Sequence, residues 1–405
     1  MNRNVLQQIF LDHYEEIIYS LHPRASVIEN IDRMLSCGDP EKGFAVYGCK
    51  QCGTIKRVPF RCHSRFCPSC GVKYTQDRVT SMSFKVLNCK HRHLVFTIPE
   101  ELRHYFLTYR TLLSELFHAV RSVILRMFYN LNHKKHFVPG FICVLHTFGR
   151  DLKWNPHIHV LLSEGGVSLS GEWQSCTHFN YHFLRVAFRT ALLNMIQHAL
   201  PEDPRILIPF RQLKAKLYGT KVNGFYVRAK PTPCKPDKVI KYIGRYLGRP
   251  AIATSRIDSY DGDNVTFHYK RHEDDQTVTE TIPVLPFIAR LIRHIPDKHF
   301  KMIRYYGIYA RHLSVDDSLV RAVPSEKHNF FLAINKWRAS LLRAFGFDPV
   351  KCPCCGQIMA FQMLVRRHQH FSLQDLFQQA SISFQAAHPP PNDPLTDGTF
   401  LLQCS

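Results

Sequence analysis

The chain has 405 residues, which is too long for one ordinary hydrophobic core, so we expect two or three domains. Its hydrophobic content of 45% and aromatic content of 12% exclude an intrinsically disordered chain. Lys and Arg number 53 against 32 Asp and Glu, and this net charge of +21 indicates a polyanionic partner. We favour nucleic acid over a membrane, since no segment approaches the ~18 apolar residues of a membrane helix.

Apolar spacing predicts the elements in chain order. Helical periodicity is present over residues 4–21, 101–130, 182–199, 235–248, 285–295 and 327–345. Strand-like runs cover residues 91–99, 141–149, 157–166, 224–230, 251–258 and 264–270. The pairs 141–149 with 157–166 and 251–258 with 264–270 are separated by polar turn residues, which predicts two hairpins.

A cysteine-rich segment lies near the start. No signal peptide is expected, because acids interrupt the apolar stretch of "MNRNVLQQIFLDHYEEI", so we expect a cytoplasmic chain whose 14 cysteines favour metal over disulfides. Cys49 and Cys52, then Cys67 and Cys70, form two Cys-x2-Cys pairs separated by fourteen residues. Four thiolates at this spacing predict one structural Zn²⁺ site, closed to chemistry.

Two further cysteine groups remain open. Cys37, Cys62 and His63 could bind a second metal beside the first. Near the C-terminus, "KCPCCGQIM" contains the pair Cys352 and Cys355, with no second pair after it. This pair is equally compatible with a zinc ligand set and with an unmetallated turn.

The histidines of "NPHIH" form a second candidate metal site. His157 and His159 point to the same face of a strand, because side chains alternate. Folding the predicted hairpin brings His146 opposite or diagonal to His159 on the same face. Three imidazoles on neighbouring strands make an open site that leaves coordination positions for a substrate oxygen.

The segment "KPDKVIKYIGRYLGRP" carries two tyrosines away from its apolar side. At ~100° per residue, the isoleucines lie on one side of the helix. Tyr242 and Tyr246 lie on the other, one turn apart, in a stripe with Lys238, Arg245 and Arg249. This arrangement suits phenolic oxygens held against a phosphate backbone.

These motifs resemble a known family. His157-Ile-His159 is similar to the metal motif of the HUH endonucleases, and Tyr242-x3-Tyr246 to their paired catalytic tyrosines. With the cysteine module, "VLHTFG…NPHIH", "KYIGRYLGRPAI" and "IRYYGIYA" in this order, the chain resembles the rolling-circle transposases of bacterial insertion sequences, of the insertion-sequence ninety-one type.

The resemblance implies an activity. A tyrosine would attack single-stranded DNA at the element's ends, leaving a 5′-phosphotyrosine and a free 3′-OH. His157, His159 and His146 would hold a catalytic Mg²⁺ or Mn²⁺. The partners implied are single-stranded DNA at transposon ends, target DNA and a host helicase with the replication machinery, since the chain has no Gly-Lys-Ser/Thr loop. The expected location is the bacterial cytoplasm, at the nucleoid.

The expected fold is α+β. A central antiparallel sheet flanked by helices follows a small zinc-binding module and precedes a mainly helical region. The expected division is residues 1–75 for the N-terminal helix and zinc module, 76–275 for the endonuclease, 276–371 for the C-terminal region and 372–405 for a tail. In the C-terminal region, "FKMIRYYGIYARH" could stack on bases or pack in the core.

Two other functions fit part of the pattern. A plasmid rolling-circle replication initiator or relaxase would use the same nuclease chemistry. A non-catalytic zinc-finger regulator would account for the charge and the cysteines, but not for the tyrosines in a cationic stripe.

Overall fold

The computed structural model describes residues 4–131, 137–168, 171–176, 178–229, 251–271, 274–310, 336–367 and 369–379. The chain divides into two compact units. The first comprises Met1–Leu35 with Cys62–Phe347, and the second comprises Ser36–Arg61 with Asp348–Ser405. In the described part of the chain, no helix combines the length and the apolar character needed to cross a membrane.

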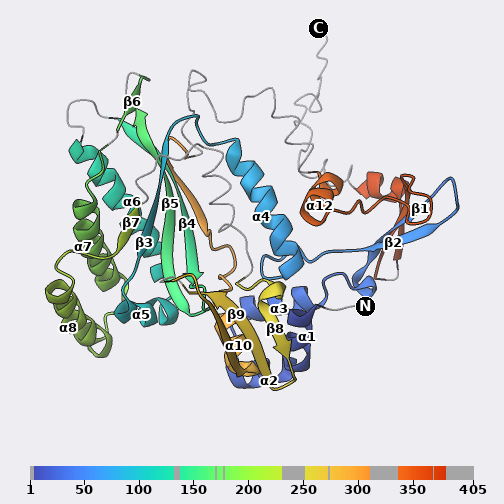
Figure 1. Ribbon diagram of the computed structural model, residues 1–405, viewed down its shortest axis with the longest axis horizontal. Coiled ribbons are helices and arrows are strands. Elements are labelled where there is room, and N and C mark those ends of the chain that lie inside the picture. Colours follow the sequence, from blue (N-terminus) through green and yellow to red (C-terminus); the bar gives the residue numbers. More distant parts are fainter. Residues whose placement is uncertain are drawn as a thin grey trace, which may run out of the picture. The chain divides into compact units, whose positions relative to one another are not determined.

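The first unit is built on an antiparallel sheet (Figure 1). Its strand order is β11-β4-β5-β3-β7, and β6 pairs with β5. The strands are β3 (His91–Thr97), β4 (Val138–Phe148), β5 (Trp154–Val167), β6 (Trp173–Ser175), β7 (Val227–Ala229) and β11 (Ile303–Gly307). The α+β class and the central antiparallel sheet are therefore confirmed.

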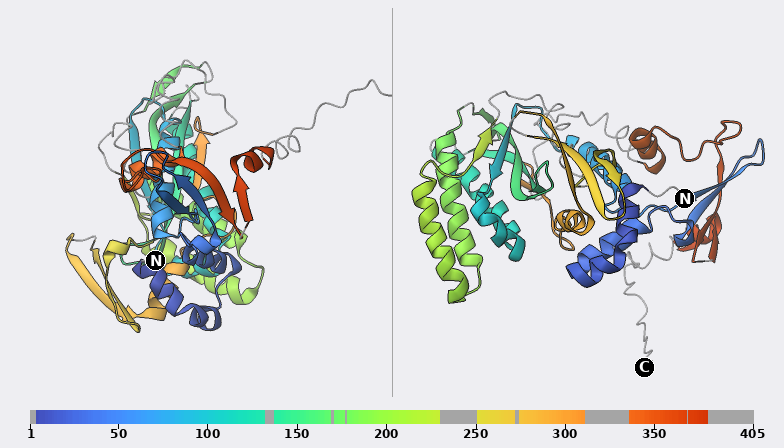
Figure 2. Two further views of the ribbon diagram at one scale, coloured as in Figure 1. Left: turned by 90° about the vertical axis from the view of Figure 1, so that its right-hand side faces the viewer. Right: turned by 60° about the horizontal axis from the view of Figure 1, so that its bottom comes forward.

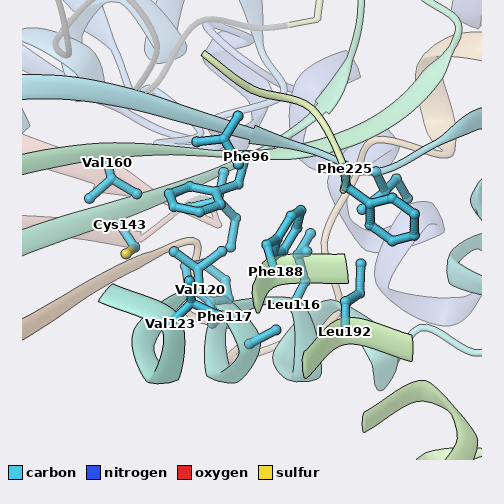
Figure 3. Packing of buried hydrophobic residues seen from close by; sticks show 14 of the residues in the cluster. Phe96, Leu116, Phe117, Val120, Val123, Cys143, Val160, Phe188, Leu192 and Phe225 are labelled. Carbon is cyan, nitrogen blue, oxygen red and sulfur yellow. The ribbon is translucent and has the colours of Figure 1, made fainter. Parts of the chain in front are cut away.

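Helices and the main hydrophobic core cover one face of this sheet. Phe96 of β3 and Val160 of β5 point into this core, where they meet Phe117 and Phe188 from two helices (Figure 3). Helix α8 packs beside α7 (Figures 1 and 2). The elements on this side are η2 (Glu100–Leu102), α5 (Arg103–Thr108), α6 (Leu112–Leu131), α7 (Tyr181–Ala199) and α8 (Pro204–Thr220). The single helix expected over 101–130 is thus divided into α5 and α6.

The opposite face carries a smaller apolar cluster. It joins Met82, at the end of α4 (Pro68–Ser83), to Ile142 and Leu161 of the sheet and to Tyr309. Helix α12 (Trp337–Phe345) packs on α4, and the Ser340 hydroxyl donates to Asp77 at 2.8 Å. Farther along β4 and β5, the same face of the sheet carries histidines instead of apolar residues. The apolar cluster therefore covers only one end of this face.

The N-terminal helices pack on the predicted second hairpin. One helix is expected over residues 4–21, but the chain forms two. They are separated at His13, whose φ of −111° and ψ of 21° are not helical. Its Nε2 lies 2.8 Å from the Gly262 carbonyl oxygen in the hairpin turn. The elements are α1 (Val5–Asp12), α2 (Tyr14–Leu21), α3 (Ala25–Leu35), η3 (Thr254–Arg256), β8 (Ile257–Tyr260), β9 (Asn264–Lys270), β10 (Thr277–Pro283) and α10 (Val284–Ile292).

The second unit joins two distant parts of the sequence. Its sheet has the order β13-β12-β1-β2, and the blue and red strands lie side by side in Figure 1. Phe44 pairs with Val365 and Gly48 with Ala360. The elements are η1 (Pro40–Lys42), β1 (Phe44–Gly48), β2 (Ile55–Pro59), β12 (Ala360–Arg366) and β13 (Gln369–Ser372).

This pairing changes the expected division of the chain. The boundaries at residues 75, 275 and 371 assumed consecutive segments, whereas the second unit is discontinuous because β1 forms hydrogen bonds with β12. The described C-terminal region is also less helical than expected. It supplies β11 to the central sheet and β12 and β13 to the second unit.

Candidate metal centres

Three histidines converge on the sheet face opposite the main core. His146 of β4 is directly paired with His157 of β5, and His159 is two residues farther along β5 on the same face. One ring nitrogen from each lies within 4.8 Å of the others. His146 and His159 are each 5% exposed, whereas His157 is half-buried and forms the accessible side of the group. We call these residues the histidine cluster.

The hydrogen bonds of His157 determine which of its nitrogens can bind a metal. Nδ1 lies 2.6 Å from the Asn155 carbonyl oxygen, which can only accept, so Nδ1 carries the proton and Nε2 has the lone pair. This Nε2 lies 3.1 Å from Nε2 of His159. Two nitrogens bound at right angles to one ion, each at ~2.1 Å, are separated by roughly 3.0 Å, so the donor set fits a divalent cation.

A fourth histidine orients the cluster, and sequence reasoning missed it. His93 of β3 is 6% exposed, and its Nε2 lies 3.0 Å from Nδ1 of His159. Burial, followed by repulsion from its imidazole neighbours, lowers the pKa of His159 well below its usual value, so the ring is neutral at pH 7. The available signal was "HRH" at 91–93, a second alternating histidine pair on the strand beside β5.

The cationic tyrosine stripe falls in a part of the chain that the structure does not describe. Its residues are Tyr242, Tyr246, Lys238, Arg245 and Arg249, and all lie outside the described residues. The described segments on either side approach the histidine-bearing strands. Strand β7 ends at Ala229, which pairs with Leu94, the neighbour of His93. On the other side, Arg256 donates at 2.6 Å to the carbonyl of Arg150, in the β4–β5 turn.

The basic aromatic stretch packs in the core. Its residues Ile303–Gly307 form β11, an edge strand of the central sheet. Tyr306 stacks on Phe141 with ring centroids 5.0 Å apart, and Tyr309 is 5% exposed. Of the two interpretations left open for this stretch, the structure supports core packing.

Cysteines form a separate group within the second unit. Cys49 and Cys52 lie in the β1–β2 turn, and Cys352 and Cys355 precede β12. Sγ of Cys49 lies 3.4 Å from that of Cys355, and Sγ of Cys52 lies 3.6 Å from that of Cys352. All four sulfurs lie within 4.8 Å of one another, and we call them the four-cysteine cluster.

The predicted grouping of Cys49 and Cys52 with Cys67 and Cys70 is therefore wrong. The reason is that β1 pairs with β12, and this pairing brings Cys352 and Cys355 close to Cys49 and Cys52. Cys67 and Cys70 belong to the first unit, where Cys67 is the N-cap residue of α4 and Cys70 lies in its first turn.

Cys62 accompanies Cys67 and Cys70 in the first unit. Its Sγ lies 3.6 Å from Sγ of Cys70, and the three sulfurs lie within 4.8 Å of one another. His63 is exposed and does not belong to this group. Cys37 is the second residue of the other unit. The three thiols of the first unit thus provide most of a second soft ligand set.

The Cys52 thiol has a strongly shifted pKa. Its Sγ lies 3.1 Å from the Thr54 hydroxyl, and this hydrogen bond is the main cause that lowers the pKa of Cys52 to about 6. A thiol with such a pKa is largely thiolate at pH 7, the form that binds metals. Four thiol sulfurs within 4.8 Å of one another are the donor type that soft metals prefer, and this geometry makes the four-cysteine cluster a candidate soft-metal site.

Comparisons with known proteins match two segments of the chain to protein families. Residues 140–316, which include the histidine cluster, match a family described as "Putative transposase". Residues 9–98 match one described as "Transposase zinc-binding domain". These matches indicate a transposase that has a zinc-binding domain.

Two curated relatives extend the match over most of the chain. The transposase for insertion sequence element IS801 of Pseudomonas savastanoi pv. phaseolicola is 29% identical over 357 residues, covering 82% of this chain and 83% of the relative. Putative transposase y4qJ of Sinorhizobium fredii (strain NBRC 101917 / NGR234) is 28% identical over 342 residues, covering 79% and 85%. No solved structure matches the chain. Over most of its length the chain is therefore similar to transposases of the insertion-sequence ninety-one type.

Proposed function

We propose that this transposase is a metal-dependent HUH endonuclease and strand transferase that acts on single-stranded DNA in rolling-circle transposition. The observation that carries the proposal is the histidine cluster, whose three ring nitrogens share one face of the central sheet within 4.8 Å. A cluster with an accessible side at His157 suits an ion that must also contact a substrate phosphate.

The proposed reaction exchanges one phosphodiester for another. The phenolic oxygen of Tyr242 or Tyr246 attacks the scissile phosphorus and loses its proton. The bond from phosphorus to the 3′ oxygen breaks, and this oxygen takes up a proton to become a free 3′-OH. The new bond is a 5′-phosphotyrosine, which conserves the energy of the phosphodiester, so no energy-rich cofactor is needed.

The histidine cluster would hold Mg²⁺ or Mn²⁺, which when bound supplies charge to polarise the scissile phosphate and stabilise the departing 3′ oxygen. The chain's own contribution is to keep the ligands neutral and oriented. The Asn155 carbonyl fixes His157, and the His93 ring fixes His159. Imidazole nitrogen favours Mn²⁺ over Mg²⁺, so we expect higher activity with Mn²⁺ at low metal concentration.

Two observations support a role for the tyrosines. In the sequence they lie one helical turn apart, in a stripe with Lys238, Arg245 and Arg249 that suits a phosphate backbone. In the structure, Ala229 at the end of β7 pairs with Leu94 of β3, and Arg256 donates to the Arg150 carbonyl in the β4–β5 turn. Both ends therefore adjoin the strands that carry the histidines.

The proposed substrates are single-stranded DNA at the element's ends and target DNA, met at the bacterial nucleoid. The net charge of +21 supports binding to a polyanion. Strand separation would come from a host helicase or the replication machinery, since the sequence has no Gly-Lys-Ser/Thr loop.

Cleavage of labelled single-stranded DNA carrying an element end tests the proposal. With Mg²⁺ or Mn²⁺ we expect a nick and a covalent adduct between protein and DNA, and with chelator neither product. Cleavage that proceeds at the same rate in chelator, or that yields no adduct, would exclude this mechanism.

A further inference from the structure

The second unit contains two loops with the same backbone design. In the first, the Cys49 N–H donates to the Thr54 carbonyl at 2.9 Å, and the Gly53 N–H donates to the Cys49 carbonyl at 3.0 Å. In the second, the Cys352 N–H donates to the Gln357 carbonyl at 2.8 Å, and the Gly356 N–H to the Cys352 carbonyl at 3.1 Å. Each loop is therefore a complete knuckle that presents two thiols.

A glycine closes each knuckle. Gly53 has φ of 72° and Gly356 has φ of 76°, in the left-handed region that other residues rarely adopt. The strands then align the two knuckles, because Gly48, just before Cys49, pairs with Ala360 at the start of β12. Backbone hydrogen bonds hold each knuckle, and the pairing of β1 with β12 holds the two knuckles together. The four sulfurs meet for these two reasons.

The sulfur separations agree with a tetrahedral ion and exclude disulfides. With Zn–S bonds of about 2.3 Å, the sulfurs of a zinc site are roughly 3.8 Å apart. The separations of 3.4 and 3.6 Å are close to this value, and both are far from the ~2.05 Å of a disulfide bond. Cys52 and Cys355 are also exposed, so apolar packing does not explain their position.

Two of the four cysteines also lie in an apolar cluster of the second unit. Among its described residues, a small hydrophobic cluster contains Cys49, Cys352 and Met359, with Tyr47 packed against it. Small units built around cysteines often gain stability from a metal or from disulfides.

We propose that one structural zinc ion is bound by four thiolates from Cys49, Cys52, Cys352 and Cys355. The two halves of this site are 300 or more residues apart in the sequence. Its second half lies outside both the matched zinc-binding domain at 9–98 and the matched transposase segment at 140–316. The zinc thus ties the C-terminal segment to the N-terminal one and is needed to hold β1 against β12.

Thiol alkylation of the wild-type, full-length protein tests this proposal without any change of sequence. Cys354 provides an internal control, because it is exposed like Cys52 and Cys355 but does not belong to the four-cysteine cluster. In zinc-loaded protein we expect maleimide to modify Cys354 quickly and the four cluster thiols at least about tenfold more slowly. After chelation all four should become reactive together, as mapped by peptide mass spectrometry.

Zinc content provides the second measurement. The double variant C352S/C355S should lose about one zinc per chain relative to wild type, as should C49S/C52S, whereas the matched control C354S should retain the full amount. The proposal is overturned if Cys52 and Cys355 react as fast as Cys354 in zinc-loaded protein, or if C352S/C355S keeps the wild-type zinc content. DNA cleavage is not used in either measurement, so the result is independent of the proposed catalytic mechanism.

Discussion

Nε2 of His93 lies 3.0 Å from Nδ1 of His159, and the two rings are stacked with their planes only 10° apart. If Nδ1 of His159 carries the proton and donates it to His93, then Nε2 of His159 is left with its lone pair facing Nε2 of His157. In the proposed metal site, His93 would thus act as a positioning residue that selects the tautomer of His159 whose Nε2 can bind the ion.

His93→Ala should weaken metal binding rather than DNA binding. Loss of an orienting partner typically costs about 10- to 100-fold in metal affinity, so we expect the Mn²⁺ concentration for half-maximal cleavage to rise by this factor. His93→Gln, which retains a hydrogen-bond acceptor, should recover part of the loss.

His91 is the matched control for this experiment. It is buried on the same strand, but it bonds to the Tyr309 hydroxyl at 2.6 Å and the Cys89 carbonyl at 2.9 Å, not to the histidine cluster. His91→Gln can lower stability but should leave the metal dependence unchanged. Equal metal dependence of the His93→Ala variant and wild type would show that the His93 contact is only structural.

His157→Ala and His159→Ala should each abolish cleavage and leave DNA binding within about a few-fold, because phosphate contacts dominate affinity. His146→Ala should have the smaller effect, since water can take its coordination position. Parallel cleavage and salt-dependent binding assays check this. A variant of His157 that cuts at the wild-type rate would remove the histidine cluster from the mechanism.

Tyr242→Phe and Tyr246→Phe delete only the attacking oxygens, so folding should hardly change. Each single variant should lose transposition, because two linked strand transfers need two phenols, although nicking can persist. The double variant should bind DNA and form no covalent adduct. Mass spectrometry that finds the adduct on another residue would refute the assignment.

His294 should make stability depend on pH. Burial lowers its pKa to about 3, while its Nδ1 lies 3.1 Å from the Thr147 hydroxyl and its Nε2 2.9 Å from the Leu152 carbonyl. In the unfolded chain the pKa returns to ~6.5, so the unfolded state binds the extra proton between pH 6.5 and 3, and stability falls as pH decreases through this range.

His294→Gln should flatten this dependence. Between pH 7 and pH 4.5 we expect the wild type to lose about 2 kcal/mol more of its free energy of unfolding than the variant does. Urea titrations at the two pH values measure the difference. Parallel losses in both proteins would mean that His294 does not titrate in this way.

Local sequence patterns were sufficient to bring the three histidines together. They were not sufficient to group the cysteines, because that grouping depends on the pairing of β1 with the distant strand β12. His146 and His157 are joined by a short hairpin, so alternation alone placed them on one face. Each knuckle was also recognisable from its Cys-x2-Cys-Gly pattern. No local feature, however, indicates that β1 takes β12 as its neighbour, so Cys49 was assigned to the nearest pair in the sequence.

The pairing of β1 with β12 also has a consequence for biosynthesis. Residues 36–61 leave the ribosome long before residues 348–372, which contain their partner strands and the second knuckle. During that interval Cys49 and Cys52 have no second knuckle, and an edge of β1 has no neighbour, while the segments between them can already fold. A chain interrupted before residue 348 therefore lacks β12 and the second knuckle, so it cannot form the sheet of the second unit.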